Sequence, residues 1–159
     1  MLKIEPAKIE DVSLILKFIQ ELAVFEEFPF DVTVTKDDLE KNLFGQNSIA
    51  ETIICYSNET PCGFAVFYNT FSTTTGKPGL HLDDLFILPQ YQGQGIGSKV
   101  LHYLSNLAKD RGCARFEWWA LKTNIAATQF YQGIGAKTVD EINVFRLNSK
   151  EIDSVAKGK

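Results

Sequence analysis

Hydrophobic and polar positions follow two different periods along this chain of 159 residues. Apolar side chains three and four positions apart predict an amphipathic helix over residues 9–24 and a second over Ile96–Arg111. Alternating or continuous apolar runs predict β-strands, because successive side chains of a strand face opposite sides. These strands are expected at Leu2–Glu5, Ala50–Tyr56, Gly63–Tyr68, Leu80–Leu88 and Arg115–Leu121.

Weaker patterns complete the expected order of elements. Thr35 precedes an acidic turn and predicts the N-cap of a short helix. The segment Asn124–Gly133 predicts a helix that ends at glycine, and Val139–Leu147 predicts a last strand or hairpin. We expect a mobile loop at Phe71–Gly79, which holds three consecutive threonines, and a polar tail that frays from Ser149.

Length and composition set limits on the class of protein. We expect a single domain at residues 1–148, followed by a polar C-terminal tail at residues 149–159. The net charge of −4 disfavours nonspecific binding to nucleic acid and is compatible with a cationic substrate. The three cysteines are odd in number and lack metal-type spacing, which predicts free thiols and no metal site. Without a signal-peptide pattern or a long apolar run, we expect a cytoplasmic protein with no membrane partner.

A glycine-rich segment, Gln92–Ser98, connects the predicted strand Leu80–Leu88 to the predicted helix that begins at Ile96. The first turn of a helix has unpaired backbone N–H groups and the positive end of the helix dipole, so it can bind phosphate. Glycines permit close approach of the phosphate and a positive φ. The spacing differs from the dinucleotide fingerprint and from the P-loop. A tight turn without a ligand is the alternative interpretation.

Two motifs resemble those of the GNAT acetyltransferase superfamily. Gln92, Gly95 and Gly97 match the fixed positions of its pyrophosphate loop, Q/R-x-x-G-x-G/A. Residues 124–136 match the pattern N-x-x-A-x-x-F-Y-x-x-x-G-A. The predicted order of elements also resembles the GNAT fold over nearly the whole chain. The resemblance implies an α/β fold with a mixed, mostly antiparallel sheet, flanked by helices and splayed at the acetyl-CoA site.

Within that superfamily the chain is most similar to the diamine acetyltransferases of the spermidine/spermine and thialysine type. Residues 21–26 resemble E-L-A-x-Y-E, residues 82–87 resemble L-E-D-F-F-V, and residues 91–98 resemble Y-R-G-x-G-I-G-S. Phe28-Pro29-Phe30 stands where the polyamine enzymes have further acidic residues, and Trp118-Trp119 replaces smaller apolar residues. The resemblance implies a homodimer that transfers acetyl from acetyl-CoA to a small primary amine, and the departures favour a thialysine-like amine over spermine.

The same resemblance implies catalytic residues. Tyr131 matches the tyrosine that protonates the leaving CoA thiolate, and an ordinary tyrosine holds its proton at neutral pH. Asp83 matches the acid that binds the amine and accepts its proton. Asp84 is expected to be structural, because neighbouring strand residues face opposite sides unless a bulge intervenes. Glu26, Glu117 and water remain alternative proton acceptors.

The predicted contacts divide between co-substrate and substrate. Acetyl-CoA is expected to meet the backbone of Leu85, Phe86 and Ile87, the loop Gln92, Gly93, Gln94, Gly95, Ile96, Gly97 and Ser98, and then Asn124, Ala127 and Tyr131. Asn124 is equally suited to a simple N-cap. The amine is expected to meet Phe25, Glu26, Asp83 and Trp118. The alternative functions are an acyl-CoA-binding module without turnover and a protein or peptide N-acetyltransferase.

Overall fold

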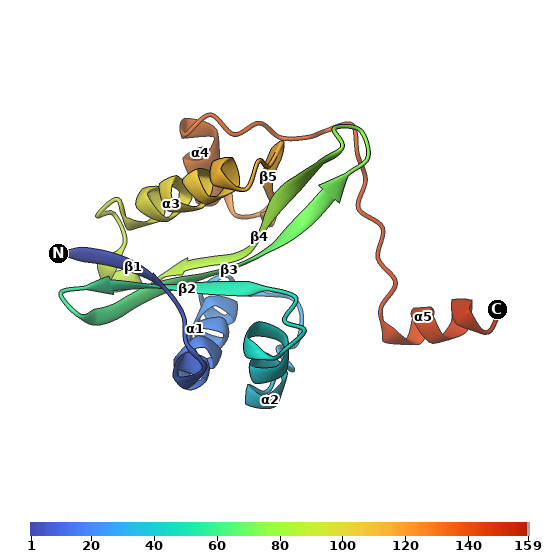
Figure 1. Cartoon of the computed structure of the whole chain (residues 1–159), viewed down its shortest axis with the longest axis horizontal. Helices are drawn as coiled ribbons and strands as arrows, with labels where there is room; N and C mark the ends of the chain where they lie inside the picture. Colours follow the sequence, from blue (N-terminus) through green and yellow to red (C-terminus); the bar gives the residue numbers. More distant parts are fainter. Residues whose placement is uncertain (159) are drawn as a thin grey trace. The chain divides into compact units, whose positions relative to one another are not determined.

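The computed structural model, which describes residues 1–158, contains both β-strands and α-helices (Figure 1). The chain divides into two units, Met1–Trp119 and Ala120–Lys159. The first unit contains β1 (Leu2–Pro6), α1 (Val12–Phe25), α2 (Lys36–Leu39), β2 (Glu51–Ser57), β3 (Thr60–Ser72), β4 (Lys77–Ile87), α3 (Ile96–Asp110) and β5 (Arg115–Trp118). Short helical turns lie at Ile9–Asp11, Glu40–Phe44 and Pro89–Tyr91. The second unit contains α4 (Ile125–Gly133) and α5 (Ser149–Ala156).

The first unit is built on a five-stranded sheet in the order β1-β2-β3-β4-β5. The first four strands are antiparallel to their neighbours, and β5 runs parallel to β4. Strand β5 accompanies β4 only over Gly79–Leu82, so the two strands separate before β4 ends. Helices α1 and α2 lie on one face of the sheet and α3 lies on the other (Figure 1). These features confirm the predicted mixed, splayed sheet flanked by helices.

Apolar spacing explains how the two helical layers attach to the sheet. The buried residues of α1 include Ile15, Phe18 and Leu22, which recur at helical spacing on one side. Phe18 stacks on Phe64 of β3 with ring centroids 5.3 Å apart. Helix α3 buries a similar stripe on the opposite face: Ile96, Val100, Leu101, Leu104 and Ala108. We call the two sides of the sheet the α1 face and the α3 face.

Local signals at two other places are confirmed. The Thr35 hydroxyl accepts a hydrogen bond from the Asp38 backbone N–H at 3.2 Å, so Thr35 is the N-cap of α2. The three cysteines are free thiols, as predicted. Burial is the main cause that raises the pKa of Cys55 to about 12, which leaves this thiol protonated at neutral pH.

The predicted loop at Phe71–Gly79 was wrong. Strand β3 continues to Ser72 and β4 begins at Lys77, so most of this segment belongs to a long hairpin. Register pairs such as Phe71 with Pro78 extend the ladder beyond the apolar pattern. The turn contains Gly76 at φ 64°, a left-handed conformation that suits glycine. The strands extend into the predicted loop because their backbones pair with each other, and polar side chains do not prevent that pairing.

Two predictions for the C-terminal part were also wrong. Residues 139–147 contain no strand, and the second unit, as far as the structure describes it, has helices and irregular segments. Without a neighbouring strand in its own unit, an alternating segment has no ladder to join. The polar tail forms α5 instead of fraying from Ser149. Its start is capped, because the Asn148 N–H donates to Glu151 Oε2 at 3.0 Å.

No helix among residues 1–158 combines the length and the apolar character that a membrane span requires.

Candidate active site

A β-bulge in β4 shapes the region around the predicted catalytic acid. Val66 of β3 pairs with Asp84, and the next residue, Phe67, pairs with Leu82. Asp83 is therefore an extra residue with no partner of its own on β3. Such a bulge places two successive side chains opposite one partner residue and disturbs their alternation. The bulge considered for this position is confirmed, and it removes the main reason for treating Asp83 and Asp84 differently.

Asp84 lies on the α1 face. Its partner Val66 and its neighbour Phe86 both belong to the core formed with α1. Burial, and then the negative charges of Asp83 and Glu26, raise the pKa of the Asp84 carboxyl to about 7. Burial also raises the pKa of Glu26, which directly follows α1. The charges of Asp83 and Glu26 thus act on the Asp84 carboxyl where α1 meets the bulge, and the pKa of Asp84 lies near neutral.

Phe25 and Glu26, two residues of the predicted substrate site, lie at the C-terminal end of α1. The ring of Phe25 is 5.8 Å from that of Phe86, measured between centroids. An open hollow of about 500 Å³ is lined by these two rings together with Val24 and Pro89. A helix C-terminus carries partial negative charge, so this end of α1 attracts a cation, as the negatively charged carboxylates do.

The two tryptophans separate as their adjacent positions predict. Trp118 pairs with Leu82, and its ring meets that of Phe116 at 5.0 Å. Trp119 instead meets the ring of His81 at 5.1 Å. Since Leu82 and His81 face opposite sides of β4, the structure brings Trp119, and not Trp118, to the face that carries Asp84.

The glycine segment has the geometry of an anion site. Gly93 and Gly95 have φ values of 74° and 75°, and a Cβ atom at either would meet no atom within 4 Å. Gly95 is the N-cap of α3, and its carbonyl accepts the Lys99 N–H at 3.2 Å. The N–H groups that precede Lys99 in this first turn have no acceptor within the helix, so they can bind phosphate.

Gln92 fixes this loop to the end of β4. Its side-chain Nε2 donates to the Ile87 carbonyl oxygen at 2.8 Å. The residues Leu85, Phe86 and Ile87 lie beyond the point where β5 leaves β4. Their backbone thus borders the separated strands, where an amide-containing chain can add to the strand edge. A β4 edge followed by a glycine-lined helix start fits the amides and phosphates of acetyl-CoA.

Helix α4, in the second unit, carries the remaining predicted residues. The Asn124 side-chain oxygen accepts the Ala127 N–H at 3.1 Å, so Asn124 is an N-cap in this structure. Tyr131 lies in the last turn of the helix, two residues before Gly133, and its ring centroid is 5.3 Å from that of Phe130. The structure confirms the helix and its cap, and the roles of Asn124, Ala127 and Tyr131 toward CoA remain predictions.

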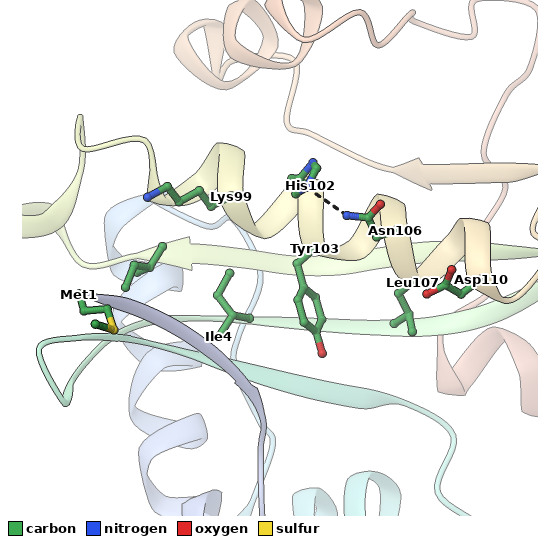
Figure 2. A pocket seen from close by; sticks show the side chains of 9 residues that line it. Met1, Ile4, Lys99, His102, Tyr103, Asn106, Leu107 and Asp110 are labelled. Atoms are coloured by element: carbon green, nitrogen blue, oxygen red, sulfur yellow. Dashed lines mark hydrogen bonds between the residues drawn. The ribbon is translucent and has the colours of Figure 1, made fainter.

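A larger hollow lies elsewhere in the first unit. It measures about 720 Å³ and lies between β1 and α3, where Ile4 and Tyr103 line it (Figure 2). His102 Nε2 and Asn106 Nδ2 are 3.1 Å apart on the helix beside it. None of the site residues predicted from the sequence lines this hollow. The carboxylates predicted from the sequence lie instead at the β4 bulge and at the end of α1.

Comparisons with known proteins agree with this geometry. A family model described as Acetyltransferase (GNAT) family matches residues 16–136. Thialysine N-epsilon-acetyltransferase of Sus scrofa is 32% identical over 146 residues, covering 87% of this chain and 85% of that protein. Spermidine/spermine N(1)-acetyltransferase-like protein 1 of Homo sapiens is 30% identical over 97% of this chain and 24% of its own length. An integron cassette protein of V. cholerae superposes with a TM-score of 0.81 at 25% identity, with 98% of each chain covered.

Proposed function

Because this chain belongs to the acetyltransferase (GNAT) family, we propose that it transfers an acetyl group from acetyl-CoA to the primary amine of a small molecule. The observation that carries the amine half of this proposal is the raised pKa of Asp84, about 7, at the β4 bulge beside Asp83 and Glu26. The thialysine enzyme of Sus scrofa supports a basic, amino-acid-like amine as the substrate class.

The co-substrate binds along the first unit in this proposal. The edge of β4 at Leu85–Ile87 pairs with the pantetheine amides, and the N–H groups from Gln92 to Ser98 hold the pyrophosphate. Gln92 keeps the loop at the end of β4 through its bond to the Ile87 carbonyl. When bound, acetyl-CoA supplies the thioester carbonyl carbon that the amine attacks.

The Asp83–Asp84 pair handles the amine. The exposed Asp83 carboxylate attracts the ammonium form, as predicted from the sequence, and Asp84 takes part in accepting its proton. An alkylammonium resembles lysine, with a pKa of about 10.4. Moving its proton to an ordinary carboxylate costs about 9 kcal/mol, whereas moving it to a group with a pKa of about 7 costs about 5 kcal/mol. The partly buried Asp84 is therefore a better acceptor than an ordinary carboxylate.

Tyr131 supplies the second proton transfer. As the amine nitrogen bonds to the carbonyl carbon, the bond between carbon and sulfur breaks, and the Tyr131 hydroxyl donates its proton to the departing thiolate. The nitrogen loses its second proton as the amide forms, and that proton returns Tyr131 to its neutral form. The ammonium proton meanwhile resides on the Asp83–Asp84 pair. This role comes from the motif that spans residues 124–136.

A panel of amines tests the proposal directly. Purified protein is mixed with acetyl-CoA and with thialysine, lysine, spermidine, spermine or a peptide N-terminus, and release of free thiol is followed. We expect turnover with thialysine-like amines and weaker turnover with spermine, since Phe28 and Phe30 stand where more carboxylates would be needed. Thiol release that no amine accelerates would refute amine acetylation. A preference for the peptide would indicate that the substrate is a protein or peptide N-terminus.

We also propose that the protein acts as a homodimer, the state that the family resemblance implies. Residues 139–147 support this, because they expose a run of apolar side chains: Val139, Ile142, Val144, Phe145 and Leu147. An exposed apolar segment of this kind is typical of a protein–protein contact.

A further inference from the structure

His81 contacts two other aromatic rings, those of Tyr68 and Trp119, near the carboxylates of the proposed amine site. Tyr68 on β3 and His81 on β4 are register partners, and their rings stack with centroids 4.9 Å apart. Trp119 contacts His81 in a T-shaped arrangement, with its ring at 77° to that of His81. His81 is only 7% exposed, whereas Trp119 is 60% exposed. The histidine is thus enclosed, and the indole presents most of its surface to solvent.

Negative charge flanks these rings on two sides. Glu117 on β5 is the register partner of His81, so it lies on the same face of the sheet, and it is exposed. Asp83 lies along β4 on the other side. Burial, and then the negative charge of Asp83, raise the pKa of the Tyr68 phenol, which indicates that the carboxylate and the phenol lie close together.

The faces of indole and phenol rings attract cations, and nearby carboxylates strengthen that attraction. We infer that Trp119, with Tyr68, is a specificity-determining residue that binds a second, non-reacting cationic group of the substrate. His81 is a positioning residue, because it holds the indole without an exposed surface of its own. The inference rests on the proposed function, since it takes Asp83 and Asp84 as the place where the reacting amine binds.

The spacing along β4 sets the length of this substrate. Asp84 and His81 are three positions apart with a bulge between them, or roughly 7 Å along the strand. An extended chain of about five carbon atoms spans that distance. The substrate class is therefore a short diamine or a basic amino acid, whose two cationic nitrogens bind at the carboxylates and at the rings.

A matched pair of amines tests this inference. The value of kcat/KM is measured for 1,5-diaminopentane and for pentylamine, which differ only in the second cation. In Trp119→Leu we expect kcat/KM for the diamine to fall about 5- to 30-fold, mainly through KM, and that for pentylamine to change less than about twofold. Trp119→Phe keeps a ring and should restore most of the loss. His81→Leu should lower the diamine value in the same way, and His81→Phe should not.

Phe71→Leu is the matched control, because Phe71 is an exposed aromatic residue like Trp119 but lies elsewhere, on the long hairpin of β3 and β4. It should leave both amines unaffected. An equal fall for diamine and monoamine in Trp119→Leu would overturn the inference, since it would show a structural role alone.

Calorimetric binding of 1,5-diaminopentane to wild type and to Trp119→Leu separates this inference from the proposed function. Weaker binding to the variant supports the ring site even if no amine is acetylated. Equal binding overturns the ring site even if acetylation proceeds.

Discussion

Asp84 illustrates how one residue acquires its chemistry from its surroundings. In the sequence it is the second of two adjacent aspartates and was expected to be structural. In the structure it pairs with Val66 on the α1 face, near Asp83 and Glu26, and its pKa rises to about 7. The residue types were visible in the sequence. The bulge and the burial that distinguish Asp84 come from pairing between strands, so a linear pattern does not reveal them.

Asp84→Asn should therefore stabilise the fold and impair the enzyme. The folded protein holds the Asp84 proton up to about pH 7, whereas the unfolded chain releases it near pH 4. Between these values the folded state binds more protons, so the wild-type free energy of unfolding falls as pH rises and stays lowered above pH 7. At pH 8 we expect the free energy of unfolding of the variant to exceed that of wild type by about 2 kcal/mol, roughly half of the free energy that corresponds to the full pKa shift. At pH 4 the two proteins should differ little. Urea unfolding at both pH values measures this.

The same variant should change the pH dependence of catalysis. In wild type, kcat/KM should rise through pH 7 as Asp84 ionises. Asp84→Asn should lose that step and fall about 10²- to 10⁴-fold in rate. Asp83→Asn is the paired variant, because it removes the neighbouring exposed charge and should raise KM for the amine. A retained step near pH 7 in Asp84→Asn would assign the titration to another group, with Glu26 as the next candidate.

Tyr131→Phe separates proton donation from packing. The ring stays against Phe130, and only the hydroxyl is lost. We expect kcat to fall about 10²- to 10⁴-fold with little change in acetyl-CoA affinity. Phe130→Leu is a control for packing of the same helix and should change stability more than kcat. Wild-type turnover in Tyr131→Phe would show that the thiolate leaves without this donor.

At the scale of elements, the strand–loop–helix unit from β4 to α3 follows the sequence closely. The helix begins at Ile96 as predicted, and two glycines of the loop have a left-handed φ. Glycine spacing and helical period are local signals, and local geometry determines this unit. The hairpin of β3 and β4 shows the opposite case. Its outer half depends on backbone pairs such as Thr70 with Gly79, which no period of apolar residues indicates.

Three glycines provide a matched test of the phosphate loop. Gly76, Gly93 and Gly95 all have φ between 64° and 75°, and a Cβ atom would meet nothing within 4 Å at any of them. Alanine at each should cost a similar amount of stability, about 1 kcal/mol, from backbone strain alone. Only Gly93→Ala and Gly95→Ala should also weaken acetyl-CoA binding, measured by calorimetry. Equal affinity in all three variants would contradict the predicted phosphate contact.

At the scale of the whole molecule, the predicted elements agree with the structure as far as about Trp119 and agree less well after it. Strands and helices of Met1–Trp119 were largely predictable, because most of them bury a periodic set of apolar side chains on one face or the other of the same sheet. The second unit kept only α4 from the predicted order. The alternation over residues 139–147 predicted a strand, yet alternation specifies a strand only when an edge is available to pair with it. A second copy of the chain is the partner that the proposed homodimer would supply.

Phe145→Ser tests that proposal. Phe145 is 91% exposed in the isolated chain, so the substitution should not destabilise the fold of one chain. If the segment lies in a dimer contact, the variant should dissociate at higher concentration than wild type, as followed by light scattering after size exclusion. Phe71→Ser, at another exposed aromatic residue, serves as the control. A monomeric wild-type protein would contradict the proposed assembly.

The bulge also determines where this protein tolerates a change in chain length. Leu80 and Leu82 precede Asp83 and face α3, whereas Asp84 and Phe86 follow it and face α1. Deleting Asp83 would join the two halves into a regular ladder and turn no other side chain over, whereas deleting Leu85 would reverse every side chain on one side of the gap. The Asp83 deletion should therefore still unfold cooperatively, and the Leu85 deletion should not. The carboxylate that we propose to bind the amine thus occupies a dispensable position of the sheet, so evolution can add or remove it by a single codon without redesigning the core.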